Sequence, residues 1–225
     1  MKLTEVFTQL AYGELSQLSM MANGPDKISD ANQMALANHV NLGLTALYKR
    51  FKLKERRTTF PLQEGVDTYA LELPDLLKIE RVVCDLDYDL PLNKESDPYS
   101  VFTPILNYVR VPLSIVNQDA DLPAELVTDN LTVVYRSNHP RIDLSLGYVD
   151  ADATELELPT SHLEALLLFV AMRTNQPLGV GQYEGIAGNS YRAKYEAECQ
   201  RLEQQNVEID ESSDMGDRLR DKGFV

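Results

Sequence analysis

The chain has 225 residues, 44% of them hydrophobic, which is enough to bury the core of one large domain or of two small ones. Its formal net charge of −14 argues against general, tight binding to nucleic acid, because such binding needs clustered Lys and Arg to displace counterions from the phosphates. The N-terminus lacks the pattern of a signal peptide and the longest apolar run, residues 165–172, is too short to cross a bilayer, so a cytoplasmic protein without a membrane partner is expected.

Two amphipathic helices are predicted at the start of the chain. Between Thr4 and Met21 apolar residues recur at spacings of three and four, with Thr4 as the expected N-cap. The second helix is expected to begin at Ser29 or Asp30 and to end near Phe51. Positive charge gathers at its end in six residues that form a candidate basic interface: Lys49, Arg50, Lys52, Lys54, Arg56 and Arg57.

This basic run has two interpretations. One is a contact with DNA phosphates or with an acidic partner protein. The other is a solvated helix end, because cations are favourable near the C-terminus of a helix. The residues alone leave both open.

A β-rich region is predicted from residue 58 to residue 158. Short apolar runs alternate there with prolines and other turn residues, which break helices and mark turns. Six runs are predicted as strands: Thr68–Leu73, Ile79–Cys84, Tyr108–Val111, Leu113–Val116, Leu131–Arg136 and Glu155–Leu158. Residues 61–160 hold nineteen Asp and Glu against six Lys and Arg, so nearly all of the net negative charge is expected in this region.

Two further helices are predicted after Pro159. The first is apolar nearly all round, which is typical of a central, buried helix, and Glu164 stands where a capping box would place it. The second is expected to begin at Gly181 or Ser190 and to end near Asn206. Residues 208–225 are polar and lack helical periodicity, but they contain scattered apolar residues, as segments that fold on binding often do. A disordered terminus is the alternative.

The order of these elements predicts an α+β fold. Residues 1–57 and 159–207 are expected to form a four-helix core, with two N-terminal and two C-terminal helices. Residues 58–158 form a β-rich insertion domain, and residues 208–225 form an extended C-terminal tail.

No motif predicts a catalytic site, a metal site or a cofactor. Asp85, Asp87 and Asp89 alternate in a way that suits Mg²⁺ or Ca²⁺, but no glycine-containing EF-hand loop follows them. A solvent-facing hairpin tip is the simpler interpretation. A small metal-dependent enzyme built on these carboxylates is kept as an alternative function.

The spacing of the histidines and cysteines also predicts that these residues are structural, without a catalytic or metal-binding role. His39, His139 and His162 have no second ligand at the spacing of a zinc site, so three unrelated positions are expected. Cys84 and Cys199 lie far apart in different kinds of segment, which favours a reducing compartment over a disulfide framework.

Three stretches carry a resemblance to a known family. They are NLGLTALYKRF at residues 41–51, LPLNKESDPYSVFTP at residues 90–104 with the later LTVVYRSNHPRI from residue 131, and the helical region of residues 158–206 that begins LPTSHLEALLLFVAM. In order and kind they resemble the head-to-tail adaptors of short-tailed, podovirus-type bacteriophages. Those proteins have two N-terminal helices, a β-rich insert, two further helices and a docking tail.

The resemblance implies a structural virion protein and no enzyme. It implies a ring, with twelve copies expected, that lies below the portal protein, extends the DNA channel and receives the tail nozzle and tail fibre proteins, while DNA only passes through. The location would be the portal vertex of the virion, and the host cytoplasm during assembly. A different tail component, such as a nozzle or gatekeeper, is a further alternative. The tail would dock on the portal through Met215, Arg218, Leu219, Phe224 and Val225.

The charge distribution suggests how copies would be placed in such a ring. The helical parts are expected to be near neutral and to make the tight contacts between copies, using the apolar stretch Leu163–Met172. The acidic insertion is expected on the outer or tail-facing surface, because like charges repel when copies are packed side by side. A lining of the DNA channel is the alternative.

Overall fold

The computed structural model describes residues 1–16, 28–85, 88–145, 147–175 and 187–205. The chain divides into two compact units, each considered by itself below. Unit 1 comprises Met1–Leu53 and His139–Val225, and unit 2 comprises Lys54–Asn138. The described part of unit 1 is mainly helical and that of unit 2 is mainly antiparallel sheet, so the fold is α+β.

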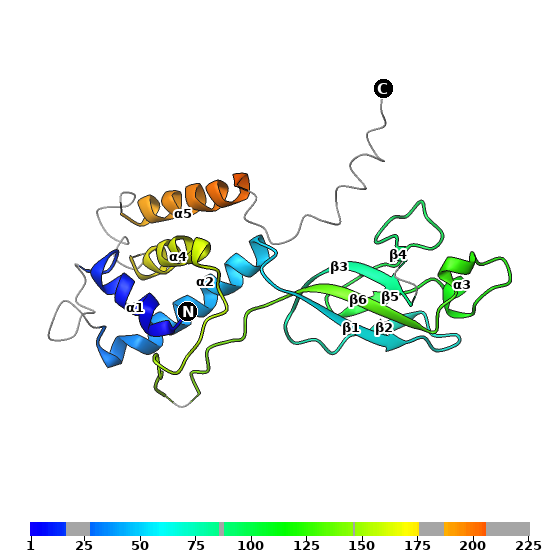
Figure 1. Ribbon diagram of the computed structural model, residues 1–225, viewed down its shortest axis with the longest axis horizontal. Coiled ribbons are helices and arrows are strands. Elements are labelled where there is room, and N and C mark those ends of the chain that lie inside the picture. The colour runs from blue at the N-terminus through cyan, green and yellow to red at the C-terminus, as the bar shows by residue number, and fades with distance from the viewer. Residues whose placement is uncertain (17–27, 86–87, 146, 176–186, 206–225) are drawn as a thin grey trace, which may run out of the picture. The chain divides into compact units, whose positions relative to one another are not determined.

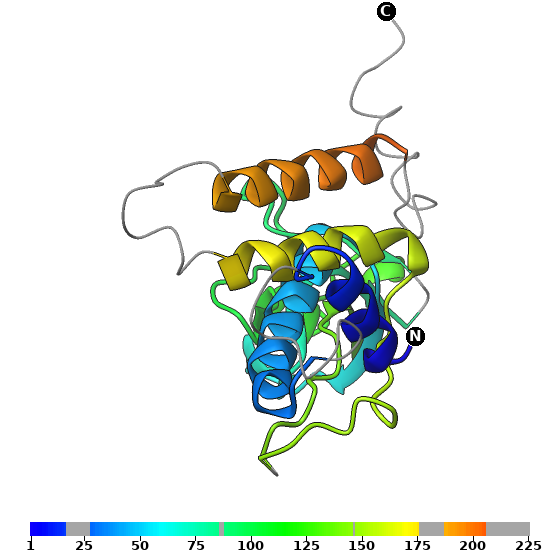
Figure 2. The ribbon, with the colours of Figure 1, turned by 90° about the vertical axis from the view of Figure 1, so that its left-hand side faces the viewer.

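Unit 1 is built around a central helix. Its elements are α1 (Leu3–Tyr12), α2 (Asp30–Arg50), the 3₁₀ turn η2 (Thr160–His162), α4 (Leu163–Asn175) and α5 (Ala187–Gln204). Figure 1 and Figure 2 show α4 between α2 and α5, and α1 also packs on α4. Six of the thirteen residues of α4 are buried, in line with its apolar sequence.

The bounds of α2 agree closely with the prediction. The N-terminal caps of α1 and of the η2–α4 region differ from the predicted ones. At α1 the residue before the helix is Lys2, and the hydroxyl of Thr4 donates to Asp152 (2.7 Å). The first helix ends at Tyr12, earlier than expected, and residues 17–21 lie outside the described part. At η2 the cap position is Pro159, with no side-chain capping bond, so the expected capping box is not formed.

The segment of residues 139–158 belongs to unit 1, although the sequence suggested the β-rich insertion. The amide of Asn41 in α2 donates to the carbonyl of Ile142 (3.1 Å) and accepts from its N–H (2.9 Å). Tyr48 donates to the carbonyl of Glu157. The predicted strand Glu155–Leu158 forms only an isolated bridge, between Glu155 and Lys2. Side chains of α2 therefore satisfy backbone polar groups at Ile142 and Glu157.

This boundary changes the expected distribution of charge. Residues 54–138 hold fifteen Asp and Glu and eight Lys and Arg, a net of −7, which leaves −7 for unit 1. Five of the acidic residues expected in the insertion lie between residues 143 and 157 instead. Net charge therefore does not distinguish the two units. The expectation that the helical part of the chain is near neutral is wrong.

Gly43 lies at a close contact between α2 and α4. A Cβ atom at this position would lie 2.7 Å from Cδ1 of Leu166 and 3.0 Å from Cδ1 of Phe169. Leu166 is fully buried. A glycine inside a helix normally destabilises it by about 0.5–1 kcal/mol relative to alanine. The close packing of α4 against this position explains why a glycine is present here.

Replacing this glycine should therefore destabilise unit 1. Gly43→Ala gains helix propensity, but the new methyl group forces α2 and α4 apart, and overpacking of this kind costs about 1–3 kcal/mol. A lower midpoint in thermal or urea unfolding, followed by circular dichroism at 222 nm, is the expected result. A raised midpoint would mean that the two helices are not in close contact here.

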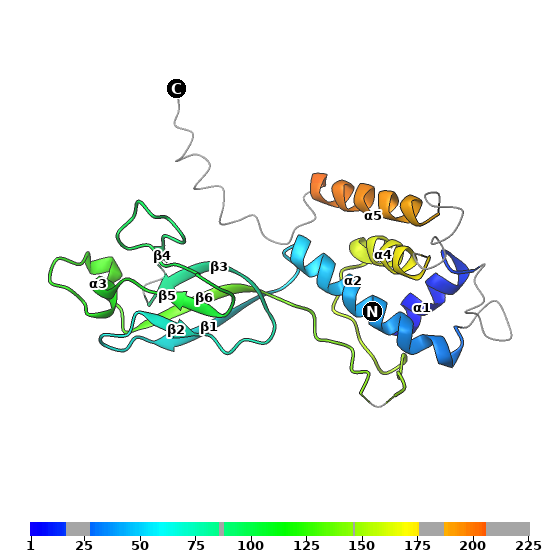
Figure 3. The same ribbon diagram turned by 180° about the vertical axis from the view of Figure 1, so that it is seen from behind.

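Unit 2 is a four-stranded sheet with a small second sheet. The main sheet has the antiparallel order β1-β6-β3-β4, and β2 pairs with β5. The elements are β1 (Glu55–Pro61), β2 (Thr68–Ala70), β3 (Leu76–Cys84), β4 (Asp89–Leu90), β5 (Tyr108–Arg110), α3 (Leu113–Val116), the 3₁₀ turn η1 (Ala124–Leu126) and β6 (Asn130–Ser137). Figure 1 and Figure 3 show α3 at one end of the unit, with the start of β1 and the end of β6 at the other.

One hydrophobic core lies on one face of the main sheet. It combines residues of β3 and β6 with Val109 of β5 and with Ile115 of α3. Phe60 of β1 and Tyr69 of β2 stack beside it, with ring centroids 4.9 Å apart. Along β6 the core residues Leu131, Val133 and Tyr135 alternate, although Val134 between them is buried as well.

Two elements of unit 2 differ from the prediction. Leu113–Val116 is a short helix rather than a strand, begun by Pro112, whose fixed φ suits a helix start. Conversely, Glu55–Pro61 is a strand that pairs with β6 over seven residues, although no strand was predicted there. Short runs of this length give too little periodicity to distinguish helix from strand.

Candidate interaction surfaces

The six residues of the basic run do not share one element. Lys49 and Arg50 end α2, Lys52 lies in the connection, and Lys54 starts unit 2. Arg56 and Arg57 are consecutive in strand β1, so their side chains point to opposite faces of the sheet. Lys49, Lys52 and Lys54 each interact with other groups of the chain.

Arg50 joins α2 to α5. Its Nε donates to Glu203 (2.6 Å) and its Nη1 donates to Glu196 (2.7 Å). The two glutamates are seven residues apart, which places them on one face of α5 two turns from each other. The hydrogen bond to Glu203, followed by that to Glu196, raises the pKa of Arg50 above its usual value. This arginine is therefore engaged inside unit 1.

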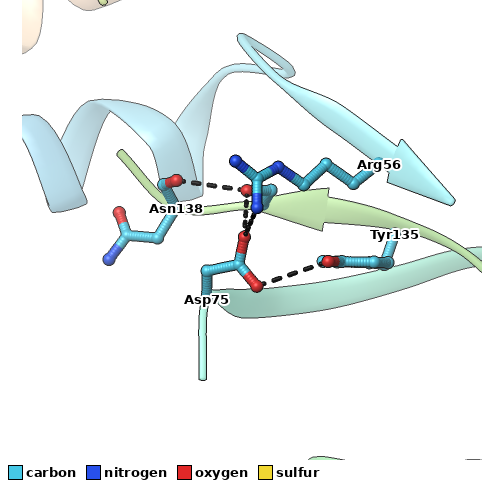
Figure 4. A network of polar contacts seen from close by, with 5 residues as sticks. Arg56, Asp75, Tyr135 and Asn138 are labelled. Atoms are coloured by element: carbon cyan, nitrogen blue, oxygen red, sulfur yellow. Dashed lines mark hydrogen bonds and ion pairs between the residues drawn. The ribbon is translucent and has the colours of Figure 1, made fainter. Parts of the chain in front are cut away.

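Arg56 belongs to a polar network around Asp75, which Figure 4 shows. One carboxylate oxygen of Asp75 accepts from Nη1 of Arg56 (2.9 Å) and from the hydroxyl of Ser137 (2.7 Å). The other accepts from the hydroxyl of Tyr135 (3.3 Å). The backbone carbonyl of Asp75 accepts from the N–H of Asn138 (2.7 Å). Burial and the nearby Asp75 carboxylate raise the pKa of Tyr135. The network holds the start of β1 and the end of β6 together.

Arg57 differs from these two arginines. It is exposed on β1 opposite Val134 of β6, and no ion pair of its side chain is found among the described residues. Of the three arginines in the run, Arg57 is thus the one whose charge faces solvent without an identified ion pair. The structure identifies no shared patch for the run, so its role as an interface stays a prediction.

Single arginine substitutions should separate a role in stabilising the fold from a role in binding a partner. Arg50→Gln and Arg56→Gln should each lower the free energy of unfolding by about 1 kcal/mol, because partly exposed ion pairs contribute little more than that. Arg57→Gln should leave the unfolding midpoint unchanged but reduce the salt dependence of assembly, as loss of a rim charge does. Chemical unfolding and light-scattering assembly rates at two salt concentrations measure both effects. If Arg57→Gln assembles at the wild-type rate in low salt, Arg57 is not part of an interface with an acidic partner.

The alternating carboxylates do not come together as metal ligands in the described chain. Asp85 accepts from the hydroxyl of Thr128 (2.8 Å) and from the N–H of Asn130 (3.3 Å), and the bond from Thr128 is the main cause of its lowered pKa. Asp89 lies 3.4 Å from Nη1 of Arg81. Asp87 lies outside the described residues. Among the residues that the structure describes, no group of three potential metal-binding side chains is found.

The histidines and cysteines occupy structural positions. His139 packs edge-on against Tyr48, and His162 packs edge-on against Phe51, with ring centroids 5.8 and 4.7 Å apart. Burial lowers the pKa of His162, which is fully buried, and it also lowers the pKa of His39. Cys84 and Cys199 are buried free thiols. Burial raises the pKa of Cys84 to about 11 and also raises that of Cys199, which disfavours the reactive thiolate.

The apolar helix α4 offers little surface for contacts between copies. Ala165, Leu166 and Val170 are fully buried within unit 1, and Leu167 and Leu168 are nearly so. The expectation that Leu163–Met172 supplies ring contacts is therefore wrong for most of its residues. The stretch serves as the core of its own unit.

Exposed apolar residues concentrate in unit 2 instead. Ten large hydrophobic residues are exposed in the described chain, and seven of them belong to unit 2: Val66, Tyr88, Ile105, Leu106, Tyr108, Leu113 and Val127. Sequence periodicity did not identify these residues, because they lie in turns and short elements. A signal was nevertheless present, since residues 98–109 contain no charged side chain in a chain that is 25% charged. The predicted docking tail, residues 208–225, lies outside the described residues.

Comparison with known proteins defines the class. Residues 11–218 match the family model described as SU10 adaptor protein, so the match spans both units. The chain belongs to the SU10 adaptor family, and it is accordingly a structural head-tail adaptor of a bacteriophage-type virion. Within the described residues, no helix combines the length and apolar character needed to span a membrane.

A similar chain occurs in a solved structure of the virion of a native gene transfer agent (GTA) particle. The two chains are 14% identical, and the alignment covers 88% of this chain and 87% of that chain with a TM-score of 0.30. A TM-score this low gives no independent support for a shared fold. No curated protein sequence matches the chain.

Proposed function

We propose that this adaptor forms a ring of twelve copies beneath the portal protein of a short-tailed virion. The ring extends the channel through which DNA passes, and it holds the tail nozzle and the tail fibres. The observation that carries the proposal is the family match over residues 11–218, which includes both units and reaches into the C-terminal segment. The buried thiols, and the carboxylates Asp85 and Asp89 that are engaged within the fold, agree with a structural role.

The C-terminal segment is the proposed portal-binding element. Met215, Leu219, Phe224 and Val225 supply apolar side chains in an otherwise polar stretch, and Arg218 adds a cation among acidic neighbours. A segment of this composition gains its structure on a partner surface, where the anchors are buried. Cofactors and metals have no part in this function.

Unit 2 is the proposed attachment site for tail proteins. Exposed large hydrophobic residues favour this assignment, since seven of ten lie in unit 2, and apolar residues away from a core often mark protein contacts. Charge no longer supports it, because both units carry −7. Arg57, exposed on β1, is the member of the basic run best placed to meet an acidic partner.

Sedimentation with a portal tests the proposal. Rings of identical subunits use a heterologous interface that must close on itself. We expect the free chain to be a monomer or a weak oligomer and to form a ring only on the portal. Analytical ultracentrifugation of the chain with the portal protein of the same virion should show co-sedimentation. Two separate boundaries at micromolar concentration would contradict the proposed function.

A further inference from the structure

A small apolar tip projects from unit 2 between residues 103 and 109. Its base is closed by the bridge between Phe102 and Arg110, whose two backbone hydrogen bonds measure 2.9 and 2.8 Å. At the tip, the N–H of Tyr108 donates to the carbonyl of Ile105 (3.2 Å) and closes a turn. The loop is therefore defined by its own backbone bonds.

Two further contacts fix the sides of the tip. The backbone N–H of Thr103 donates to the side-chain oxygen of Asn93 (2.9 Å), and the N–H of Leu71 donates to the carbonyl of Asn107 (2.7 Å). Asn107 has a φ of 66°, a left-handed conformation that asparagine tolerates better than most residues. A tip held in this way loses little conformational freedom when it binds.

The tip presents aliphatic side chains to solvent. Ile105 and Leu106 are each 62% exposed, Tyr108 is 39% exposed, and Pro104 is exposed beside them. The nearest charged residues along the sequence are Asp97 and Arg110. Single exposed hydrophobic residues are ordinary, but adjacent ones on a rigid, uncharged loop are unusual, and such clusters mark binding surfaces.

We infer that the tip of residues 104–108, with Ile105 and Leu106 at its centre, docks into an uncharged apolar pocket on a tail protein of the virion, not on the portal. This inference rests on the proposed adaptor function, since the partner is a component of the same particle. A projecting tip requires a concave partner. Because the tip has no charge, burial of its apolar side chains is what holds the contact, and ionic strength affects it little.

The chemistry of unit 2 disfavours other partners. DNA and anionic lipid are repelled by its net charge of −7, and the tip itself offers no cation to a phosphate. A second copy of the chain would need a matching apolar hollow. A hollow of about 380 Å³ in the described part of unit 1 is lined by Arg141, Asp143 and Ser145 beside two aliphatic residues, which does not match an uncharged tip.

Site-specific crosslinking in assembled particles identifies the occupant. The full chain would carry p-benzoylphenylalanine in place of Ile105, with the same replacement at Tyr148 as control, because Tyr148 is also 62% exposed but lies in unit 1. We expect position 105 to crosslink to one tail protein of the virion, and position 148 not to crosslink to that protein. Mass spectrometry should locate the crosslink in an uncharged apolar pocket.

Three other outcomes would overturn the inference. Crosslinks from position 105 to a second copy of this chain would make the tip a contact between copies. Flotation of the free chain with phosphatidylglycerol vesicles, lost in a variant with Ile105→Ser and Leu106→Ser, would make it a membrane contact. Particles that contain the chain but give no crosslink from position 105 would leave the tip unoccupied. Absence of the chain from the particles would instead refute the proposed function.

A binding measurement gives the expected size of the effect. The double variant Ile105→Ser with Leu106→Ser should keep the wild-type unfolding midpoint, because both side chains already lie in solvent. It should still join the portal, yet bind the crosslinked partner at least about tenfold more weakly, as loss of central apolar anchors does. Tyr148→Ser should bind that partner as the wild type does. Equal affinity of the double variant would refute the inference.

Discussion

Deletion of residues 208–225 should abolish binding to the portal while both units stay folded. The buried residues in the described part of unit 1 extend no further than Leu202, so the deletion removes none of that core. The deleted segment contains the proposed apolar anchors, and without them affinity should fall at least about 100-fold, or about 2.7 kcal/mol. Ultracentrifugation with the portal measures the binding, and thermal unfolding of the truncated chain serves as the control.

Point substitutions should show which residues of this segment bind. Phe224→Ala should weaken portal binding about tenfold or more, since buried aromatic anchors dominate protein interfaces. Glu211→Ala should change the affinity little, because a solvated carboxylate contributes little to binding. If the truncated chain binds the portal as tightly as the full chain, the segment is a disordered terminus and docking occurs elsewhere.

Asp75→Ala should be the most destabilising surface substitution in unit 2. The carboxylate accepts hydrogen bonds from Arg56, Tyr135 and Ser137, and the Ser137 side chain is fully buried. Removing the acceptor leaves donors from two strands without their partner, at a cost of about 2–3 kcal/mol. Because Asp75 lies where β1 starts and β6 ends, the main sheet should open from this end first.

A matched control separates this network from a general effect of charge. Asp119→Ala removes an exposed carboxylate from the same unit, and its unfolding midpoint should stay within about 0.5 kcal/mol of wild type. Hydrogen exchange of the β1 and β6 amides should increase only in Asp75→Ala. Equal unfolding midpoints for both variants would show that the network contributes nothing to stability.

The long helices were the most predictable part of the fold. Helix α2 was expected from Ser29 or Asp30 to Phe51 and spans Asp30–Arg50, because apolar residues recur along it at spacings of three and four, as at Val40, Leu44 and Leu47. Its end is also set locally, as Phe51 takes an extended backbone conformation. Among the strands, β2, β3, β5 and β6 were predicted from short apolar runs bounded by turn residues, whereas β1 and β4 were not.

Short or irregular segments were not predictable in this way. The four residues Leu113–Val116 fit a strand as well as a helix, and Pro112 together with the burial of Ile115 decides for the helix. Residues 139–158 form almost no regular structure, so nothing in their sequence shows that Asn41 and Tyr48 bind them. Only the folded helices provide those partners.

The candidate surfaces were predictable in part. The run from Lys49 to Arg57 is visible in the sequence, but the partners of Arg50 lie about 150 residues away and Asp75 is nineteen residues from Arg56. Pairing at such distances has no local signal. Exposure of Ile105 and Leu106 likewise depends on the fold, although the uncharged window around them is a usable hint.

Electron microscopy of the chain mixed with the portal protein of its virion tests the central claim most directly. We expect a ring of twelve copies attached below the portal, with a continuous channel along the axis and with residues 208–225 in contact with the portal. Portal particles without added density, or a chain bound away from the channel axis, would contradict the assignment of this protein as the adaptor ring.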